Sequence, residues 1–228
     1  MTIRALSATA IILTIILTIL LSVSCNRPGE GFTDEERSLI NGADSIMRVL
    51  TIEDSLDNAV LRSISTDMSA EALSSPEYER LVRLMVETVT HPSQDGVGIA
   101  GPQVGLNRRV VAVQRFDKPG EPFEVYPNIR IVSMSDSLAY GPEGCLSVPG
   151  RRGEVLRSQE IVIEYADIEL LNEADDRDHG RQHRGGLRRR KSSPALLPVC
   201  RDTVKGFTAV IFQHECDHLD GVLYIDRL

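Results

Sequence analysis

The chain has 228 residues, a length that suits one globular domain with some additional segments. Hydrophobic residues make up 42% of it, which is enough for a buried core. The formal net charge is −8, from 25 basic and 33 acidic residues, and the chain has no tryptophan. An acidic chain with few stacking side chains argues against a nucleic-acid partner.

The first 24 residues differ in composition from the rest of the chain. Arg4 is their only charged side chain, and an apolar run interrupted only by serine and threonine follows it. This pattern predicts a signal peptide over residues 1–24. Cys25 comes directly after it and resembles the lipidated cysteine of a bacterial lipoprotein. We therefore expect a membrane-anchored protein of the bacterial cell envelope. The alternatives are an uncleaved anchor, or a misassigned start codon and a cytoplasmic protein.

A polar segment and an amphipathic helix come next. Residues 25–54 are polar and acidic, and we expect them to form a tether or lead-in segment ahead of a catalytic domain over residues 55–228. Ser75 has the character of an N-cap and Pro76 that of a first helical residue. Apolar residues then recur at helical spacing: Tyr78, Leu81, Val82, Met85 and Val89. A glycine-rich loop over residues 96–105 follows this predicted helix.

The middle of the chain has the composition of β-strands. Residues 108–114, 126–133 and 158–167 are rich in β-branched side chains and predict three strands. No long helical pattern separates them, so antiparallel strands with short connections fit better than parallel units. Residues 171–198 are charged and nearly free of apolar side chains before residue 196, which predicts an exposed, partly disordered insertion.

The last predicted element is a helix with Asp202 as its N-cap and Gly221 at its end. This helix carries the pattern H-E-x-x-H from His214 to His218. Residues four apart lie one turn above each other, so both imidazoles can reach one metal ion, and Glu215 can reach a reacting water. The apolar residues on the same face as the histidines are Phe207, Val210 and Ile211.

The motif leaves the third ligand of the ion unidentified. A zinc peptidase would take it from downstream, but the required histidine position holds Tyr224 and few residues follow. An upstream ligand is therefore expected, and the two histidines of the charged insertion are poorly placed for a rigid site. Cys216 lies about 200° around the helix from His214 and faces away. The upstream candidates are His91, Cys200 and Cys145. With Cys25 assigned to the lipid, three cysteines remain, and this odd number does not suggest a disulfide framework.

Three segments, in order, resemble the motifs of the peptide deformylase family. They are GVGIAGPQVG at 96–105, EGCLS at 143–147 and QHECDHLDG at 213–221. The resemblance extends from about residue 55 to the C-terminus. Gly101 departs from the alanine that is usual in the family, and the insertion is longer than usual. The first segment also matches the dinucleotide fingerprint G-x-G-x-x-G, but a helix precedes it and a proline interrupts the residues after it, so we reject that interpretation.

The resemblance implies a fold, a metal site and a mechanism. The fold is α+β, with antiparallel β-sheets packed around a C-terminal helix that carries the H-E-x-x-H pattern. The implied ligands of one divalent ion are Cys145, His214 and His218, with Fe²⁺ as the native metal and Zn²⁺, Ni²⁺ and Co²⁺ as alternatives. Glu215 would move the proton, and the Gln103 amide and the Leu146 N–H would stabilise the developing oxyanion. Glu143 and Asp217, beside the ligands, are expected to hydrogen-bond them.

The implied substrate is a peptide or nascent protein that begins with N-formylmethionine. The residues expected to bind it are the loop residues Gly96, Val97 and Gly98, which offer a backbone edge, and the helix residues Phe207, Val210 and Ile211, which line an apolar pocket. We expect a monomer. Three other functions stay open: a zinc peptidase, a thiol hydrolase with Cys145 as nucleophile, and a non-catalytic envelope lipoprotein that has kept the fold.

Overall fold

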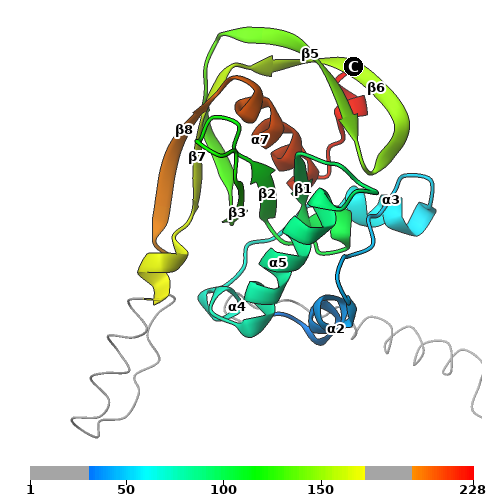
Figure 1. Cartoon of the computed structure of the whole chain (residues 1–228), viewed down its shortest axis with the longest axis vertical. Coiled ribbons are helices and arrows are strands. Elements are labelled where there is room, and N and C mark those ends of the chain that lie inside the picture. Colours follow the sequence, from blue (N-terminus) through cyan, green and yellow to red (C-terminus); the bar gives the residue numbers. More distant parts are fainter. Residues whose placement is uncertain (1–30, 173–196) are drawn as a thin grey trace, which may run out of the picture.

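The structure, a computed structural model, describes residues 31–172 and 197–228. The predicted signal peptide 1–24, Cys25 and most of the predicted insertion 171–198 lie outside the described residues. Within the described residues, helices combine with antiparallel strands, so the predicted α+β class is confirmed. Figure 1 shows α2, α4 and α5 in the lower part of the molecule, and α7 in the upper part among the strands.

Short helices build the first part of the described chain. Each starts after a residue whose side chain accepts a backbone N–H of the first turn, as favourable N-caps do. The helices are α2 (Asp34–Gly42), α3 (Ser55–Leu61), α4 (Ala70–Leu73) and α5 (Pro76–Thr90), and their N-caps are Thr33, Asp54, Ser69 and Ser75. The predictions of Ser75 as N-cap and Pro76 as the first helical residue are confirmed.

The strands form three sheets in the described residues, and every pair within them is antiparallel. The first sheet has the order β1-β2-β3, with β1 (Gly98–Ala100), β2 (Val110–Gln114) and β3 (Phe123–Pro127). A short 3-10 helix, η1 (Gly101–Val104), connects β1 to the chain before β2. The second sheet has the order β4-β7-β8, with β4 (Arg130–Met134), β7 (Glu160–Ala166) and β8 (Val199–Lys205). The third is the long hairpin of β5 (Leu138–Cys145) and β6 (Val148–Ser158).

Helix α7 (Gly206–Leu219) carries the H-E-x-x-H pattern and lies between the sheets (Figure 1). It packs against β1 and β2 and also contacts β6, β7 and β8. Phe212, fully buried on this helix, meets the ring of Tyr126 edge-on at 4.9 Å between centroids. Gly221 follows the helix with φ +71°, a conformation that suits glycine just beyond a helix end, so the predicted stop is confirmed. The 3-10 helix η2 (Tyr224–Arg227) comes next.

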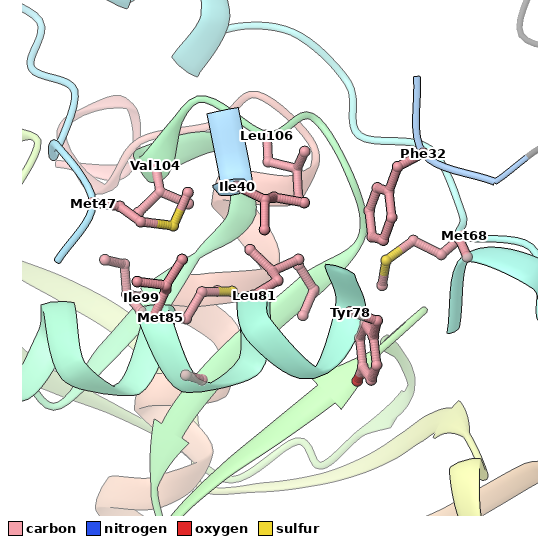
Figure 2. Packing of buried hydrophobic residues seen from close by; sticks show 14 of the residues in the cluster. Phe32, Ile40, Met47, Met68, Tyr78, Leu81, Met85, Ile99, Val104 and Leu106 are labelled. Atoms are coloured by element: carbon pink, nitrogen blue, oxygen red, sulfur yellow. The ribbon is translucent and has the colours of Figure 1, made fainter. Parts of the chain in front are cut away.

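An apolar core lies between α5, α2 and the first sheet, and Figure 2 shows it from close by. The α5 side chains Tyr78, Leu81, Met85 and Val89 are buried there, as the helical spacing predicts, and Val82 is partly buried against them. Figure 2 shows Ile40 of α2 above α5, facing Leu81 and Met85.

Within the predicted tether or lead-in segment, the described residues 31–54 pack against the rest of the described chain. Phe32, Ile40, Met47 and Leu50 are at most 5% exposed. The backbone N–H of Leu50 also donates to the carbonyl of Gln103 at 2.8 Å. This segment is polar on average, but its few apolar side chains complete the core beside α5, so it belongs to the folded domain.

Two boundaries of the predicted elements differ from the structure. The predicted strand at 126–133 is interrupted, because Asn128 adopts φ +53° and its side chain bonds both backbone groups of Met68, so β3 ends and β4 begins there. Asp202 is not the N-cap of the last helix. It lies in β8, where its carboxylate accepts from the buried Arg115 at 2.9 Å, and α7 begins at Gly206.

Candidate metal centre and active site

Three side chains with metal-binding atoms meet where the β5–β6 hairpin crosses α7. They are Cys145, His214 and His218, and their ligand atoms all lie within 4.8 Å of one another. Cys145 ends β5, at the point where the register of the hairpin shifts, and its Sγ is 3.2 Å from Nε2 of His218. The structure therefore supplies Cys145 as the upstream partner of the two histidines. Of the other candidates, His91 caps the end of α5 and Cys200 donates to Asp167, away from this group.

The donor set fits one divalent cation. One thiolate and two imidazoles are ligands for zinc and similar transition metals, and three protein ligands leave a position for a reacting molecule. The Nδ1 atom of His214 is 2.8 Å from a carboxylate oxygen of Glu143, which leaves its Nε2 for the metal. The ring of His218 is buried, and its Nδ1 has no hydrogen-bond partner among the described residues. Glu143 is thus the residue that orients a ligand, as the sequence predicts.

A buried arginine holds Glu143 in place. Arg157 of β6 is 4% exposed and donates to both oxygens of Glu143, at 2.7 and 3.0 Å. Burial alone would raise the pKa of Glu143, but the hydrogen bonds from His214 and Arg157 lower it to about 2. Glu143 is therefore an anion, and it accepts a hydrogen bond from the His214 imidazole. Asp217 was predicted to hydrogen-bond a ligand. It instead accepts from Arg157 at 2.7 Å and forms an ion pair with Arg227.

Glu215 lies beside the ligands on α7 and faces the first sheet. It is 4% exposed, and its Oε2 has no hydrogen-bond partner among the described residues. Burial raises the pKa of its carboxyl group to about 7. A Cβ atom added to Gly98 of β1 would lie 2.4 Å from Oε1 of Glu215, so only glycine allows the strand to come this close. The carboxyl group is therefore confined between α7 and a glycine of β1.

Gln103 presents its amide to the same centre from η1. Its Oε1 accepts from the Ala100 N–H at 2.8 Å, and its Nε2 lies 3.2 Å from Ser147 Oγ and 3.5 Å from Cys145 Sγ. The amide orientation is thus fixed, with the donor end toward the ligand sulfur. The departure at Gly101 has a local reason, because a Cβ there would lie 2.6 Å from the carbonyl oxygen of Leu106.

A cavity of about 830 Å³ opens over this centre. Its lining contains every substrate-binding residue predicted from the sequence: Gly96, Val97, Gly98, Phe207, Val210 and Ile211. Gln103, Cys145, Leu146, His214 and Glu215 also line it, whereas His218 is buried behind them. Phe207 is 56% exposed, although it shares the predicted helix face with the buried Ile211, and its ring contacts that of Phe116.

Several residues around the cavity were missed by the sequence reasoning. Arg151 and Arg152 of β6, Pro142 and Gly144 of β5, and Gln94 and Asp95 before β1 also line it. They lack a local pattern, because they reach the cavity only through the β5–β6 hairpin and the turn after α5. Arg157 was also missed. It lies in a β-rich segment in which alternate side chains face the core, and an arginine at a core-facing position needs a buried carboxylate partner.

The fold and the site define a metal-dependent hydrolase in which a cysteine from a hairpin joins two histidines from a helix. The family model for polypeptide deformylase matches residues 46–177 and 199–228. The chain therefore belongs to the peptide deformylase family, as its motifs predict.

Relatives and solved structures agree with this membership. A peptide deformylase of Leptospira biflexa is 34% identical over 180 residues, which cover 76% of this chain and 84% of the relative. Peptide deformylase 2 of Nostoc sp. is 37% identical over 164 residues, 69% of this chain and 75% of the relative. A peptide deformylase of Acinetobacter baumannii, solved with Met-Ala-Ser bound, superposes with a TM-score of 0.61 at 28% identity. That match covers 80% of this chain and 98% of the other.

Proposed function

We propose that this chain hydrolyses the N-formyl group of peptides or proteins that begin with N-formylmethionine and releases formate. The observation that carries the proposal is one cavity around which the ligand triad, Glu215 and the Gln103 amide converge. Membership of the peptide deformylase family supports it, and so does the related structure that holds Met-Ala-Ser, a peptide beginning with deformylated methionine.

A divalent ion held by Cys145, His214 and His218 would polarise the formyl group and make a water molecule a better nucleophile. We propose Fe²⁺ as the native ion because the family resemblance implies it. The mixed sulfur and nitrogen donors also accept Zn²⁺, Ni²⁺ and Co²⁺. Glu143 and Arg157 keep the His214 ring in the orientation that leaves Nε2 free for the ion.

Glu215 is the proposed proton carrier. It accepts a proton from the water as the water oxygen bonds to the formyl carbon, and it then gives that proton to the amine as the C–N bond breaks. A carboxyl group with a pKa of about 7 suits both steps near neutral pH. Proton transfer of this kind contributes roughly 10²–10⁴-fold to the rate. Gln103 Nε2 and the backbone N–H of Leu146 would donate to the formyl oxygen as it becomes negative.

The substrate backbone is proposed to lie along β1. In the described sheet β1 is an edge strand that pairs only with β2, so its free edge can pair with an extended peptide. Gly96 and Gly98 allow a close approach of that peptide, and Val97 lies between them. The methionine side chain would enter the apolar part of the cavity formed by Phe207, Val210 and Ile211.

The test uses the domain without residues 1–24, loaded anaerobically with Fe²⁺ or Ni²⁺, and follows formate from formyl-Met-Ala-Ser. We expect turnover by the wild type, at least a roughly 100-fold loss in Glu215→Ala, and no loss in Glu79→Gln, an exposed change on α5. Unformylated peptides should stay intact, which separates a deformylase from a general peptidase. A chelator should abolish turnover, which excludes Cys145 as a covalent nucleophile. The absence of formate would contradict the proposal.

We further propose that the enzyme is a monomer attached to the cell envelope through a lipid on Cys25, after removal of residues 1–24 as a signal peptide. The charged and apolar pattern of residues 1–25 supports this attachment. Among the described residues, none of the helices is long and apolar enough to span a bilayer. Figure 1 shows α2, near the start of the described chain, far from the β5–β6 hairpin.

Cell fractionation tests this attachment directly. We expect the protein in the membrane fraction, with a lipid on Cys25 and without Met1. A Cys25→Ser variant should lose the lipid. A wholly cytosolic protein that retains Met1 would contradict the proposal without affecting the deformylase activity.

A further inference from the structure

Phe207 lines the proposed methionine pocket from a part of α7 that the helix does not stabilise by itself. It lies in the first turn of α7, and 56% of the residue is exposed. Lys205, the N-cap of α7, makes no side-chain cap hydrogen bond, and Gly206 has φ +61°. This helix start therefore lacks the stabilisation that a serine, threonine, aspartate or asparagine cap supplies. The position of the Phe207 ring consequently depends on contacts from outside the helix.

Phe116, in the turn between β2 and β3, supplies such a contact. The centroid of its ring is 5.3 Å from that of Phe207, with 49° between the planes, an arrangement in which two aromatic rings attract each other. Phe116 is partly buried against the core cluster that contains Ile211 and Phe212, and it is not one of the residues that line the cavity. Phe116 therefore joins a cavity residue to the core without reaching the cavity itself.

The residues that follow the two phenylalanines are also linked. The carboxylate of Asp117, directly after Phe116, accepts from Arg115 Nε at 2.8 Å and from Nη2 at 2.7 Å. Hydrogen bonds from Arg115 and, to a smaller extent, from Thr208 lower the pKa of Asp117. Thr208 directly follows Phe207 on α7. Two adjacent contacts thus join the β2–β3 turn to the first turn of α7, one between rings and one between a carboxylate and a hydroxyl group.

An aromatic ring beside the methionine side chain has a chemical consequence. A thioether sulfur gains from contact with an aromatic ring, and a methylene group in its place does not make that contact. We propose that Phe116 is a positioning residue for the substrate, which holds the Phe207 ring against the methionine sulfur. Phe116 thereby makes the enzyme prefer formyl-Met peptides to formyl-norleucine peptides, in which a methylene group replaces the sulfur. The inference rests on the proposed function and adds a residue that acts only through Phe207.

The test measures kcat and KM of the full chain, loaded anaerobically with Ni²⁺, for formyl-Met-Ala-Ser and formyl-norleucine-Ala-Ser. Phe116→Ala removes the supporting ring. Phe116→Leu removes the ring but keeps most of the buried volume, so it gives the same test if Phe116→Ala does not fold. Phe123→Ala on β3 is the matched control, because Phe123 is also partly buried but packs against the core beside α5 and does not line the cavity.

We expect the wild type to prefer the methionine peptide about two- to tenfold in kcat/KM, the range of sulfur–aromatic contacts. In Phe116→Ala this preference should disappear through a higher KM for formyl-Met-Ala-Ser with kcat unchanged, because a binding contact is lost and the reacting groups are not moved. Phe116→Leu should lose part of the preference, and Phe123→Ala should keep it. A change confined to general stability would not alter the ratio between the two peptides.

A double-mutant cycle tests whether Phe116 acts through Phe207. Phe207→Ala alone should also abolish the preference, and adding Phe116→Ala to it should change neither kcat nor KM further. The inference would be overturned by a wild type that does not distinguish the two peptides. It would also be overturned by an unchanged preference in both Phe116 variants, or by a full further loss in the double variant. In each of these cases formate release by the wild type would leave the proposed function standing. A wild type that releases no formate from either peptide would overturn the proposed function and the inference with it.

Discussion

The contact between β1 and α7 makes Gly98→Ala a sharp test of the role of Glu215. An added methyl group would lie 2.4 Å from Oε1 of Glu215 and 2.9 Å from a side-chain carbon of Ile211, whereas ordinary contacts begin near 3.4 Å. The carboxyl group must therefore move by about 1 Å. A displacement of that size can cost about 100-fold in rate when the displaced group takes part in the reaction.

The assay compares kcat and KM for formyl-Met-Ala-Ser in Gly98→Ala and in Gly141→Ala. Gly141 lies on β5, and a Cβ atom there would meet nothing within 4 Å, so it is the matched control. We expect kcat of Gly98→Ala to fall about 100-fold while metal content and thermal midpoint stay near wild type. A kcat within about threefold of wild type would refute the reasoning. A rise in KM with kcat unchanged would mean that the methyl group blocks the peptide and does not displace Glu215.

The remaining predictions concern the two buried arginines. Glu143→Ala leaves Arg157 with one carboxylate fewer, so we expect a loss of about 3 kcal/mol in the free energy of unfolding and roughly tenfold or more weaker metal binding. Urea unfolding and metal titration measure both, and a loss below about 1 kcal/mol would contradict the expectation. Arg115→Met should cost about 3 kcal/mol at about pH 7, because the Arg115 side chain is 2% exposed and surrounded by carboxylates. The hydrogen bond from Arg115 lowers the pKa of Asp117, so that stabilisation is present at neutral pH and lost on acidification. The difference between wild type and Arg115→Met should therefore shrink as the pH falls below about 4, and a constant difference would argue against the ion pair.

The sequence located the chemistry well because the chemistry depends on local patterns. The spacing from His214 to His218 places both rings on one face of α7 whatever the rest of the chain does. The segment that contains Cys145 could be recognised because its motif and two other motifs occur in the order that is typical of the family. The sequence does not show that the three ligand atoms lie within 4.8 Å of one another. The fold brings them together, because Cys145 comes from a hairpin far from the helix in sequence.

Features that depend on long-range contacts were not predictable in the same way. The hydrophobic side chains of residues 31–54 are too few for a core of their own, and their burial depends on α5. Asp202 has the character of an N-cap, but the buried Arg115 holds it in β8. Arg157 reaches Glu143 only because β6 runs back along β5. Each of these is a tertiary contact that overrides a local preference.

The most direct test of the central claim is X-ray absorption spectroscopy at the zinc edge of the Zn²⁺-loaded protein. The account predicts one sulfur at about 2.3 Å and two imidazole nitrogens at about 2.0–2.1 Å from the ion. The sulfur contribution should disappear in Cys145→Ser and persist in Cys200→Ser. A metal shell without sulfur in the wild type, or one that Cys145→Ser leaves unchanged, would contradict a centre built from Cys145, His214 and His218.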